Sequence, residues 1–412
     1  MIRIIDRNME YGIIIAVCFL LVVGVLMIHS AGTGDNVESS NVWQKQVIWG
    51  VFSLFVILGI GFLPLKVIYA FPYVFYVIIL ILLIMTEVYG TMGGKAERWL
   101  SIGPLRFQPS EFMKIASILA LARFLSDKNN RPTGYKKLII PSLLIFVPTA
   151  IIMKQPDLGT SLVFCSLLIP MLYWAGLDST RLFFLVAPVM SAIFSAPFLP
   201  FFSWVTWVIF MFIVLAVLYL SRYTLAAMGF VISTNILAGI ATPYVFSKLK
   251  PYQQDRITTF LNPEADPLGS GYQIINAKIA LGSGGVLGKG VGQGRYTEGG
   301  FLPRAHTDFI FSVIGEELGF VGSILVLGVI FYIVYRGIMI ATLVKNPFMS
   351  ISAIGISTVF LFHTFVNIGM VVGIMPVTGL PLLFLSYGGS SCITSAMMVG
   401  LLLNFSLNRH EY

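Results

Sequence analysis

The chain has 412 residues, of which 57% are hydrophobic and 11% charged, with a formal net charge of +8. Because a soluble domain carries about 25% charged residues, this composition predicts a polytopic integral membrane protein and excludes a large soluble domain. The positive charge is spread over short loops, whereas nucleic-acid binding needs a concentrated basic face. We therefore expect the membrane, and no nucleic acid, as a partner.

Apolar runs of about 20 residues, the length that crosses a bilayer, recur along the whole chain. They predict an all-α bundle of about 10–12 transmembrane helices. The first run is longer than a signal-peptide core and is expected to remain as a span. The runs lie at 11–30, 45–63, 67–86, 110–126, 137–153, 158–177, 182–200, 203–220, 225–242, 309–335, 347–370 and 382–406.

Basic residues of the short loops fall on one side of the membrane when all twelve runs are counted as spans. This bias predicts a multi-pass protein of the cytoplasmic membrane with both termini in the cytoplasm. The opposite side then holds the loops at 31–44, 87–109 and 243–308. The basic residues are Arg3, Arg7, Lys66, Lys128, Arg131, Lys136, Lys137, Arg181, Arg222, Arg336, Lys345 and Arg409.

The loop at 243–308 is far longer than a usual connection, which indicates a functional segment. Its glycine-rich stretch, 282–290, can bend tightly and bring backbone N–H groups near an anion. A nucleotide-binding P-loop would need glycine at 283 and Ser or Thr at 290, where the chain has Ser283 and Gly290. We expect no nucleotide or organic cofactor, and a loop that folds back against the bundle.

Carboxylates stand at the membrane boundary where this loop ends. Asp308 is followed at once by an apolar run that carries Glu316 and Glu317. An ionised carboxylate in hydrocarbon costs at least about 2.5 kcal/mol, so such residues usually face a polar cleft and have a function there. Asp308 is therefore the first catalytic candidate. Glu316, about 12 Å deeper along a helix, is expected to support the cleft.

A second polar group lies on the same side, around the start of the run at 110–126. Arg98 and Arg106 precede this run, while Glu111 and Lys114 share one face of its first turns. A purely structural ion pair between the last two is one interpretation. The surplus of cations favours the other, in which Arg98, Arg106 and Lys114 bind a diphosphate or another anion.

Three further polar positions have simpler interpretations. Asp157 is placed to cap the following helix. His363 and Asn367 lie one turn apart in a late span and are expected to hydrogen-bond between helices. The last outer turn, which includes Ser386, is rich in small residues that permit close backbone approach.

Short motifs along nearly the whole chain resemble those of the SEDS (shape, elongation, division, sporulation) family, and occur in the same order. The resemblance is closer to the elongation type, RodA, than to the division type, FtsW. Leu268, where the division type tends to have Phe, and the string at 375–381 carry this distinction. The motifs lie at 108–111, 155–160, 266–273, 306–311 and 386–391.

The resemblance implies a peptidoglycan glycosyltransferase that polymerises lipid II at the outer face of the cytoplasmic membrane during cell elongation. It implies a class B penicillin-binding protein, which is a transpeptidase, and the rod-shape cytoskeletal complex as partners. Asp308 matches the family's essential acidic residue, and Arg106 and Lys114 match basic positions that the family needs. The expected supporting residues are Glu111, Asp157, His306, Thr307, Glu316 and Ser386.

This chemistry agrees with the residues. A carboxylate can take the proton of the acceptor 4-hydroxyl as it attacks the donor sugar. Arg106, Lys114 or a divalent cation such as Mg²⁺ or Mn²⁺, whose ligands the sequence leaves open, can stabilise the leaving undecaprenyl diphosphate. Because an α bond becomes a β bond, one displacement suffices and a second, nucleophilic carboxylate is unnecessary.

The chain departs from the family pattern at two places. Arg304 stands where the family has Glu, which removes one acidic group beside the cleft. Family members usually have ten spans, and 182–242 appears as an extra transmembrane pair within one domain, 1–412. An even number of added spans leaves the sidedness of everything downstream unchanged.

Two other functions fit the same residues. A lipid II flippase also needs buried charges and broken helices. Against this interpretation, the charged groups gather at the outer mouth, and the sequence has no obvious internal repeat. A non-catalytic scaffold for the transpeptidase is the third possibility, and it would tolerate loss of Asp308.

Overall fold

The computed structural model describes residues 10–411, apart from 33–40, 90, 93–96, 103–104, 133, 197–203, 222, 249–253, 255–258, 263–270, 299–300 and 303–304. Arg3, Arg7, Arg222, Arg304 and most of the motif at 266–273 therefore lie outside the described residues. The sequence predicts one domain, but the contacts within the structure group the chain into two compact units. Unit 1 is Met1–Ala175 with Gln273–Tyr412, and unit 2 is Gly176–Tyr272.

The protein is all-α apart from one small sheet, as predicted. Within the described residues, seven helices are long and apolar enough to cross a membrane. Four further apolar helices there have 10–17 residues. The long helices of unit 1 are α2 (Tyr11–Ala31), α3 (Val42–Gly61), α5 (Pro72–Tyr89), α6 (Pro109–Leu125), α7 (Ile139–Lys154), α8 (Leu158–Trp174), α15 (Ile310–Leu343), α16 (Pro347–Val372) and α17 (Gly389–Leu407).

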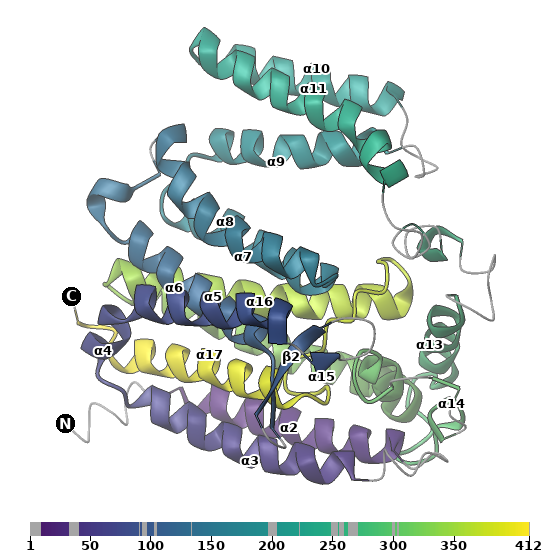
Figure 1. Ribbon diagram of the computed structural model, residues 1–412. Coiled ribbons are helices and arrows are strands. Elements are labelled where there is room, and N and C mark those ends of the chain that lie inside the picture. The colour runs from purple at the N-terminus through teal and green to yellow at the C-terminus, as the bar shows by residue number, and fades with distance from the viewer. Residues whose placement is uncertain are drawn as a thin grey trace. The chain divides into compact units, whose positions relative to one another are not determined.

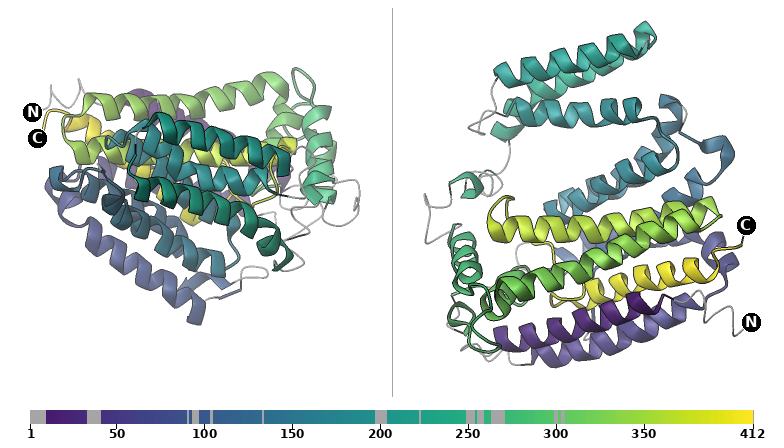
Figure 2. Two further views of the ribbon diagram at one scale, coloured as in Figure 1. Left: turned by 90° about the horizontal axis from the view of Figure 1, so that it is seen from above. Right: turned by 180° about the vertical axis from the view of Figure 1, so that it is seen from behind.

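Helices α16 and α17 lie at the centre of unit 1. Within their most apolar stretches 72% and 78% of the residues are buried, compared with 28% for α3 at the periphery. Helix α16 packs against α15, α8 and α6, while α17 packs against α3. Figure 1 shows these helices running side by side, and Figure 2 shows the same bundle from above and from behind.

Local sequence explains where α16 begins and ends. The Asn346 side chain accepts a hydrogen bond from Phe348 N at 3.0 Å, and Pro347 occupies the first helical position, where its missing N–H costs nothing. The helix ends at Gly373, which adopts the left-handed conformation (φ +75°) that a helix C-terminus favours. Its polar residues are thereby held at fixed heights in the bundle.

Two expected runs differ from the observed helices. The run at 382–406 is helical only from Gly389, because 373–388 form an irregular loop in which Leu380 and 382–385 are buried. The run at 67–86 is interrupted at Phe71, where α4 (Leu65–Ala70) ends before Pro72 begins α5. At 382–388 hydrophobicity does not distinguish a helix from a buried loop, whereas the break at Phe71 leaves that side chain exposed.

A small antiparallel sheet precedes α6, at a place where the sequence predicted only a loop. It consists of β1 (Thr91–Met92), β2 (Glu97–Ile102) and β3 (Leu105–Phe107), in the order β1-β2-β3. Ser101 pairs with Arg106 across β2 and β3. The sheet therefore fixes the backbone at both Arg98 and Arg106 just before α6 begins.

The glycine-rich stretch folds back against the bundle, as predicted. It follows α13 (Tyr272–Ser283) and precedes the short α14 (Arg295–Glu298). Lys289 N and Gly290 N donate to the carbonyls of Glu316 and Glu317, each at 3.0 Å, and Phe320 N donates to Gly285 O at 2.9 Å. These bonds cross a break in α15, where Gly319 has a non-helical backbone (φ +67°, ψ −165°).

Gly288 is required for this close approach. Its φ is +80°, and a Cβ there would clash with the backbone carbonyl of Glu317. We expect Gly288→Ala to destabilise the protein by about 1–3 kcal/mol, because a side chain both clashes and strains this backbone. Thermal unfolding in detergent measures the change. Gly282→Ala is the matched control, since that helical glycine has open space around its Cβ position; equal unfolding temperatures for both variants would contradict the prediction.

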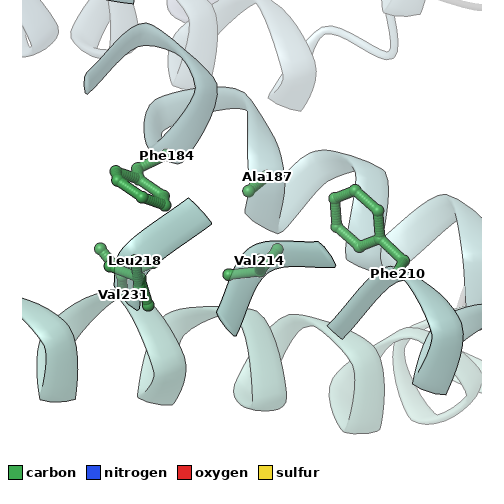
Figure 3. Close-up of a cluster of buried hydrophobic side chains, with 6 residues drawn as sticks. All are labelled: Phe184, Ala187, Phe210, Val214, Leu218 and Val231. Carbon is green, nitrogen blue, oxygen red and sulfur yellow. The ribbon is translucent and has the colours of Figure 1, made fainter. Parts of the chain in front are cut away.

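Unit 2 contains α9 (Ser179–Phe194), α10 (Trp204–Leu220) and α11 (Leu225–Lys248). These helices occupy the stretch predicted to hold an extra transmembrane pair, and α11 extends six residues beyond the expected end at 242. Ser191 Oγ donates to Asn235 Oδ1 at 2.7 Å, which joins α9 to α11. Figure 3 shows the apolar core that the three helices share: Phe184, Ala187, Phe210, Val214, Leu218 and Val231.

Candidate functional site

The loop at 373–388 brings the predicted catalytic residue together with other polar groups. Asp308 is half-buried just before α15, and Gly379 lies against its carboxylate, since a Cβ on Gly379 would be 3.4 Å from Asp308 Oδ2. The same stretch of loop touches the start of α8, where a Cβ on Gly159 would be 2.8 Å from Thr378 O. Glycine at these two positions therefore permits close contact around Asp308.

Asn367 of α16 fixes the backbone at Asp308. Its Nδ2 donates to Asp308 O at 2.9 Å and to Leu380 O at 2.8 Å, which orients the amide. Asn367 Oδ1 and Thr378 Oγ1 are buried and have no hydrogen-bond partner among the described residues. Because buried polar atoms are normally paired, this region has unused capacity to bind a hydroxyl group or water.

Glu111 and Lys114 form a fully internal ion pair. Lys114 Nζ donates to the two Glu111 oxygens at 2.8 and 2.9 Å, and lies 3.1 Å from His363 Nε2. The ring's Nδ1 faces Pro381 O at 3.0 Å, so Nδ1 carries the proton and Nε2 accepts from Lys114. These contacts use all three ammonium donors and join α6, α16 and the loop; direct binding of a diphosphate by Lys114 stays a prediction.

Arg98 stabilises the turn before α8. Its guanidinium donates to the carbonyls of Gln155 (3.0 Å) and Pro156, and lies 3.4 Å from the Asp157 carboxylate. Asp157 Oδ1 also accepts from Thr160 N at 3.2 Å, which confirms its predicted capping role. Through Gly159, this turn lies beside the loop that contacts Asp308, although Arg98 itself is engaged by the turn.

Arg106 is the cation best placed to meet an anion. Its side chain is exposed, and none of the carboxylates in the described part of the chain pairs with it. It is close enough to Tyr387 to act on that phenol electrostatically. Tyr387 N donates to His306 O at 2.9 Å. The His306 and Tyr387 rings lie edge to face, with their centroids 6.1 Å apart. Arg106, His306 and Tyr387 therefore belong to one neighbourhood.

Ser386 and Thr307 have different surroundings. Ser386 Oγ accepts from Leu382 N at 2.8 Å, and Ser386 N donates to Leu382 O at 2.9 Å. Ser386 thus closes a turn of the loop, which is a supporting role. Thr307 is half-buried beside Asp308.

The pKa of Tyr387 provides a test of this neighbourhood. Burial raises its pKa above the usual 10, and the positive charge of Arg106 opposes that shift by favouring the phenolate. We expect Arg106→Gln to raise the Tyr387 pKa further, so that the phenol stays protonated to a higher pH. Tyrosine-selective ¹³C NMR during an alkaline titration measures it. An unchanged or lower pKa would show that Arg106 is distant from Tyr387.

Glu316 lies outside this group of residues. It is fully buried, and its Oε1 accepts from Lys289 Nζ at 2.7 Å and from Tyr296 N at 3.1 Å. These contacts hold the glycine-rich stretch against α15, and the expected support of the cleft by Glu316 stays a prediction. Glu317 similarly accepts from Ser30 of α2 and from Gly292 N.

Metal-binding clusters of three or more His, Cys, Asp or Glu side chains do not occur within the described residues. A site that takes one protein carboxylate and completes its coordination with substrate phosphates and water does not need such a cluster. Glu111, Asp157 and Glu316 each pair with a cationic side chain, and Asp308 lies half-buried beside Gly379.

Comparison with known proteins decides the family. The FtsW/RodA/SpoVE family model, described as "Cell cycle protein", matches residues 11–203 and 203–411. The chain belongs to this family. The match confirms the SEDS resemblance of the motifs, and its two parts meet at residue 203, within the stretch of the expected extra pair.

Relatives cover this SEDS chain almost completely. Peptidoglycan glycosyltransferase RodA of Treponema pallidum is 33% identical over 97% of this chain and 98% of its own length. Peptidoglycan glycosyltransferase MrdB of Escherichia coli K12 is 35% identical over 95% and 91%. Stage V sporulation protein E of Bacillus subtilis is 34% identical over 96% of both chains.

Solved structures share the fold of this SEDS protein. A chain from a structure titled "Structural coordination of polymerization and crosslinking by a peptidoglycan synthase complex" has a TM-score of 0.71 and 27% identity, over 98% of this chain and 99% of that one. Thermus thermophilus rod shape determining protein RodA has a TM-score of 0.63 and 23% identity, over 98% of both chains.

Sequence reasoning did not assign a site role to four residues that the structure places here: His363, Asn367, Tyr387 and Thr394. Thr394 Oγ1 lies 3.3 Å from Glu111 Oε2. His363 was expected to bond between helices, and its contact with Lys114 confirms this. A signal was present, because two polar residues one turn apart in an otherwise apolar helix are costly unless they have partners. Tyr387 and Thr394 carried no comparable signal.

Proposed function

We propose that this chain is a peptidoglycan glycosyltransferase that polymerises lipid II during cell elongation, with Asp308 as the general base. Family membership and the names of the relatives from Treponema pallidum and Escherichia coli support the activity. The observation that carries the residue assignment is the half-buried Asp308 carboxylate beside buried acceptors with unused bonding capacity.

The proposed reaction is a single displacement. The acceptor sugar's 4-hydroxyl gives its proton to the Asp308 carboxylate while its oxygen attacks the anomeric carbon of the donor. The bond from that carbon to the undecaprenyl diphosphate breaks, and the diphosphate leaves with the electron pair. Asn367 holds the Asp308 backbone in place, and Gly379 leaves room beside the carboxylate. Such fixed positioning lowers the entropic cost of the step.

Charge on the leaving diphosphate needs a cationic partner. Arg106 supports this role, because its guanidinium is exposed and lacks a carboxylate partner among the described residues, whereas Lys114 is enclosed by Glu111 and His363. A divalent cation, Mg²⁺ or Mn²⁺, at the diphosphate would supply further charge stabilisation.

We also propose the partners and the membrane location of the chain. A neighbour of known structure comes from a complex that coordinates polymerisation and crosslinking, which supports a transpeptidase of the class B penicillin-binding type as a partner. The rod-shape cytoskeletal machinery is the further proposed partner. We propose the cytoplasmic membrane as the location, with the start of α2 and the end of α17 on the cytoplasmic side.

Polymerisation of labelled lipid II by the purified chain, alone and with its transpeptidase partner, tests the activity. We expect a ladder of glycan products from the complex. Vesicles containing the chain and fluorescent lipid II test the alternative. Translocation of lipid II without any polymer would support the flippase function instead of the enzyme. If neither translocation nor polymer is observed, the scaffold function is the one supported.

A further inference from the structure

A cavity of about 250 Å³ lies at the end of the unit 1 bundle remote from Asp308. Asp308 precedes the first residue of α15, whereas Val344, which follows the last one, lines the cavity. The ends of α6 and α8 and the first turn of α16 provide the other walls, through residues such as Ser126, Trp174 and Ser350. Segments far apart in the sequence therefore line one cavity that is partly open to the surface.

The charge of this cavity is positive. Arg131 and Lys345 line it, both side chains are exposed, and no lining residue is acidic. Lys345 N donates to Arg409 O at 3.3 Å, which adds a third basic residue nearby. The neighbouring acid, Asp127, accepts from Asn129 N at 3.0 Å. Within the described chain, no carboxylate forms an ion pair with the Arg131 guanidinium.

The neutral polar groups of the wall are already bonded. Trp174 Nε1 donates to Ser350 Oγ at 2.7 Å, and Ser350 Oγ donates to Ala341 O at 2.6 Å. Ser126 Oγ donates to Arg123 O at 2.9 Å. Binding of a ligand by this cavity therefore depends on the two cations, helped by the positive end of the α16 helix dipole.

We propose that this cavity binds a phosphate group at the membrane surface, carried by the headgroup of an anionic phospholipid. Basic pockets between transmembrane helix ends suit such headgroups, and a tryptophan at the same level is typical of the membrane–water interface. The space admits a phosphodiester with its glycerol. Soluble phosphate shares the chemistry, but the position at the ends of apolar helices favours the lipid.

The site would act on the whole bundle. The walls of the cavity belong to the ends of four helices, α6, α8, α15 and α16. The candidate site lies farther along the same helices: Asp157 and Asp308 precede α8 and α15, while Lys114 and His363 lie within α6 and α16. A bound headgroup therefore joins the far ends of the helices that form the candidate active site. This binding is independent of the proposed glycosyltransferase activity.

Native mass spectrometry of the full-length chain in detergent, titrated with phosphatidylglycerol or phosphatidylcholine, tests the proposal. We expect preferential retention of phosphatidylglycerol, and a loss of roughly 30-fold in its affinity in Arg131→Gln/Lys345→Gln, since each cation near the surface contributes about fivefold. Lys128→Gln/Lys136→Gln removes the same charge from exposed positions outside the cavity and should change the affinity less than about threefold.

A second variant separates charge from shape. Ala175→Trp fills the cavity without changing its charge, and we expect it also to release phosphatidylglycerol. Displacement by millimolar inorganic phosphate would identify soluble phosphate as the source of the group; retention would identify the lipid. Equal retention of the two lipids, or equal losses in the cavity and control double variants, would overturn the proposal. So would undiminished binding by a folded Ala175→Trp chain.

Discussion

Asp308→Asn is expected to reduce lipid II polymerisation by about 10²–10⁴-fold, the contribution of a positioned general base. The amide matches the carboxylate in shape but accepts a proton poorly. The backbone carbonyl of residue 308 keeps its bond to Asn367, so the variant should fold and unfold as the native chain does. Glycan ladder assays with the transpeptidase partner present measure the rate.

Asp127→Asn is the matched control, because it makes the same change at an exposed residue just after the C-terminal end of α6. Asparagine can also cap the short turn there, so the rate should stay within roughly twofold of the native value. Native ladders from a folded Asp308→Asn chain would remove Asp308 from the catalytic role and leave the family assignment intact.

Lys114→Met is expected to destabilise the protein by about 3–5 kcal/mol. The substitution leaves the Glu111 carboxylate buried without its cation, and such an uncompensated charge is strongly unfavourable. Glu111→Gln should have a similar effect by isolating the ammonium. The double variant Glu111→Gln/Lys114→Met should recover much of the loss, because no buried charge remains. Unfolding by denaturant in detergent micelles gives the coupling.

Lys136→Met removes an exposed lysine and should change stability by less than about 0.5 kcal/mol. Additive losses in the double variant would mean that Glu111 and Lys114 do not stabilise each other. Polymerisation by the double variant then separates the two interpretations of the pair. Activity in a stable double variant indicates a structural pair, while a stable but inactive one indicates a role of Lys114 toward the diphosphate.

The arrangement of the predicted site residues depended on contacts that motifs do not contain. Asp308 stood out because a carboxylate at a membrane boundary is costly, and this reasoning needs no structure. Arg98, Arg106 and Lys114 were equivalent as cations in the sequence. The structure distinguishes them, because Arg98 holds the turn at 155–157, Lys114 is enclosed, and Arg106 remains exposed.

The sequence by itself determined the class of the protein. Its hydropathy identified a helical membrane bundle, and every apolar run contains a helix, since apolar length is a local property. The motifs determined the family because each of them is also a short, local stretch of sequence. Only the tertiary structure decided that 373–388 form a buried loop, and that this loop brings Asp308, His363 and Tyr387 together. Its course is set by glycines and by bonds from Asn367 on another segment, and such long-range contacts leave no periodic pattern in the sequence.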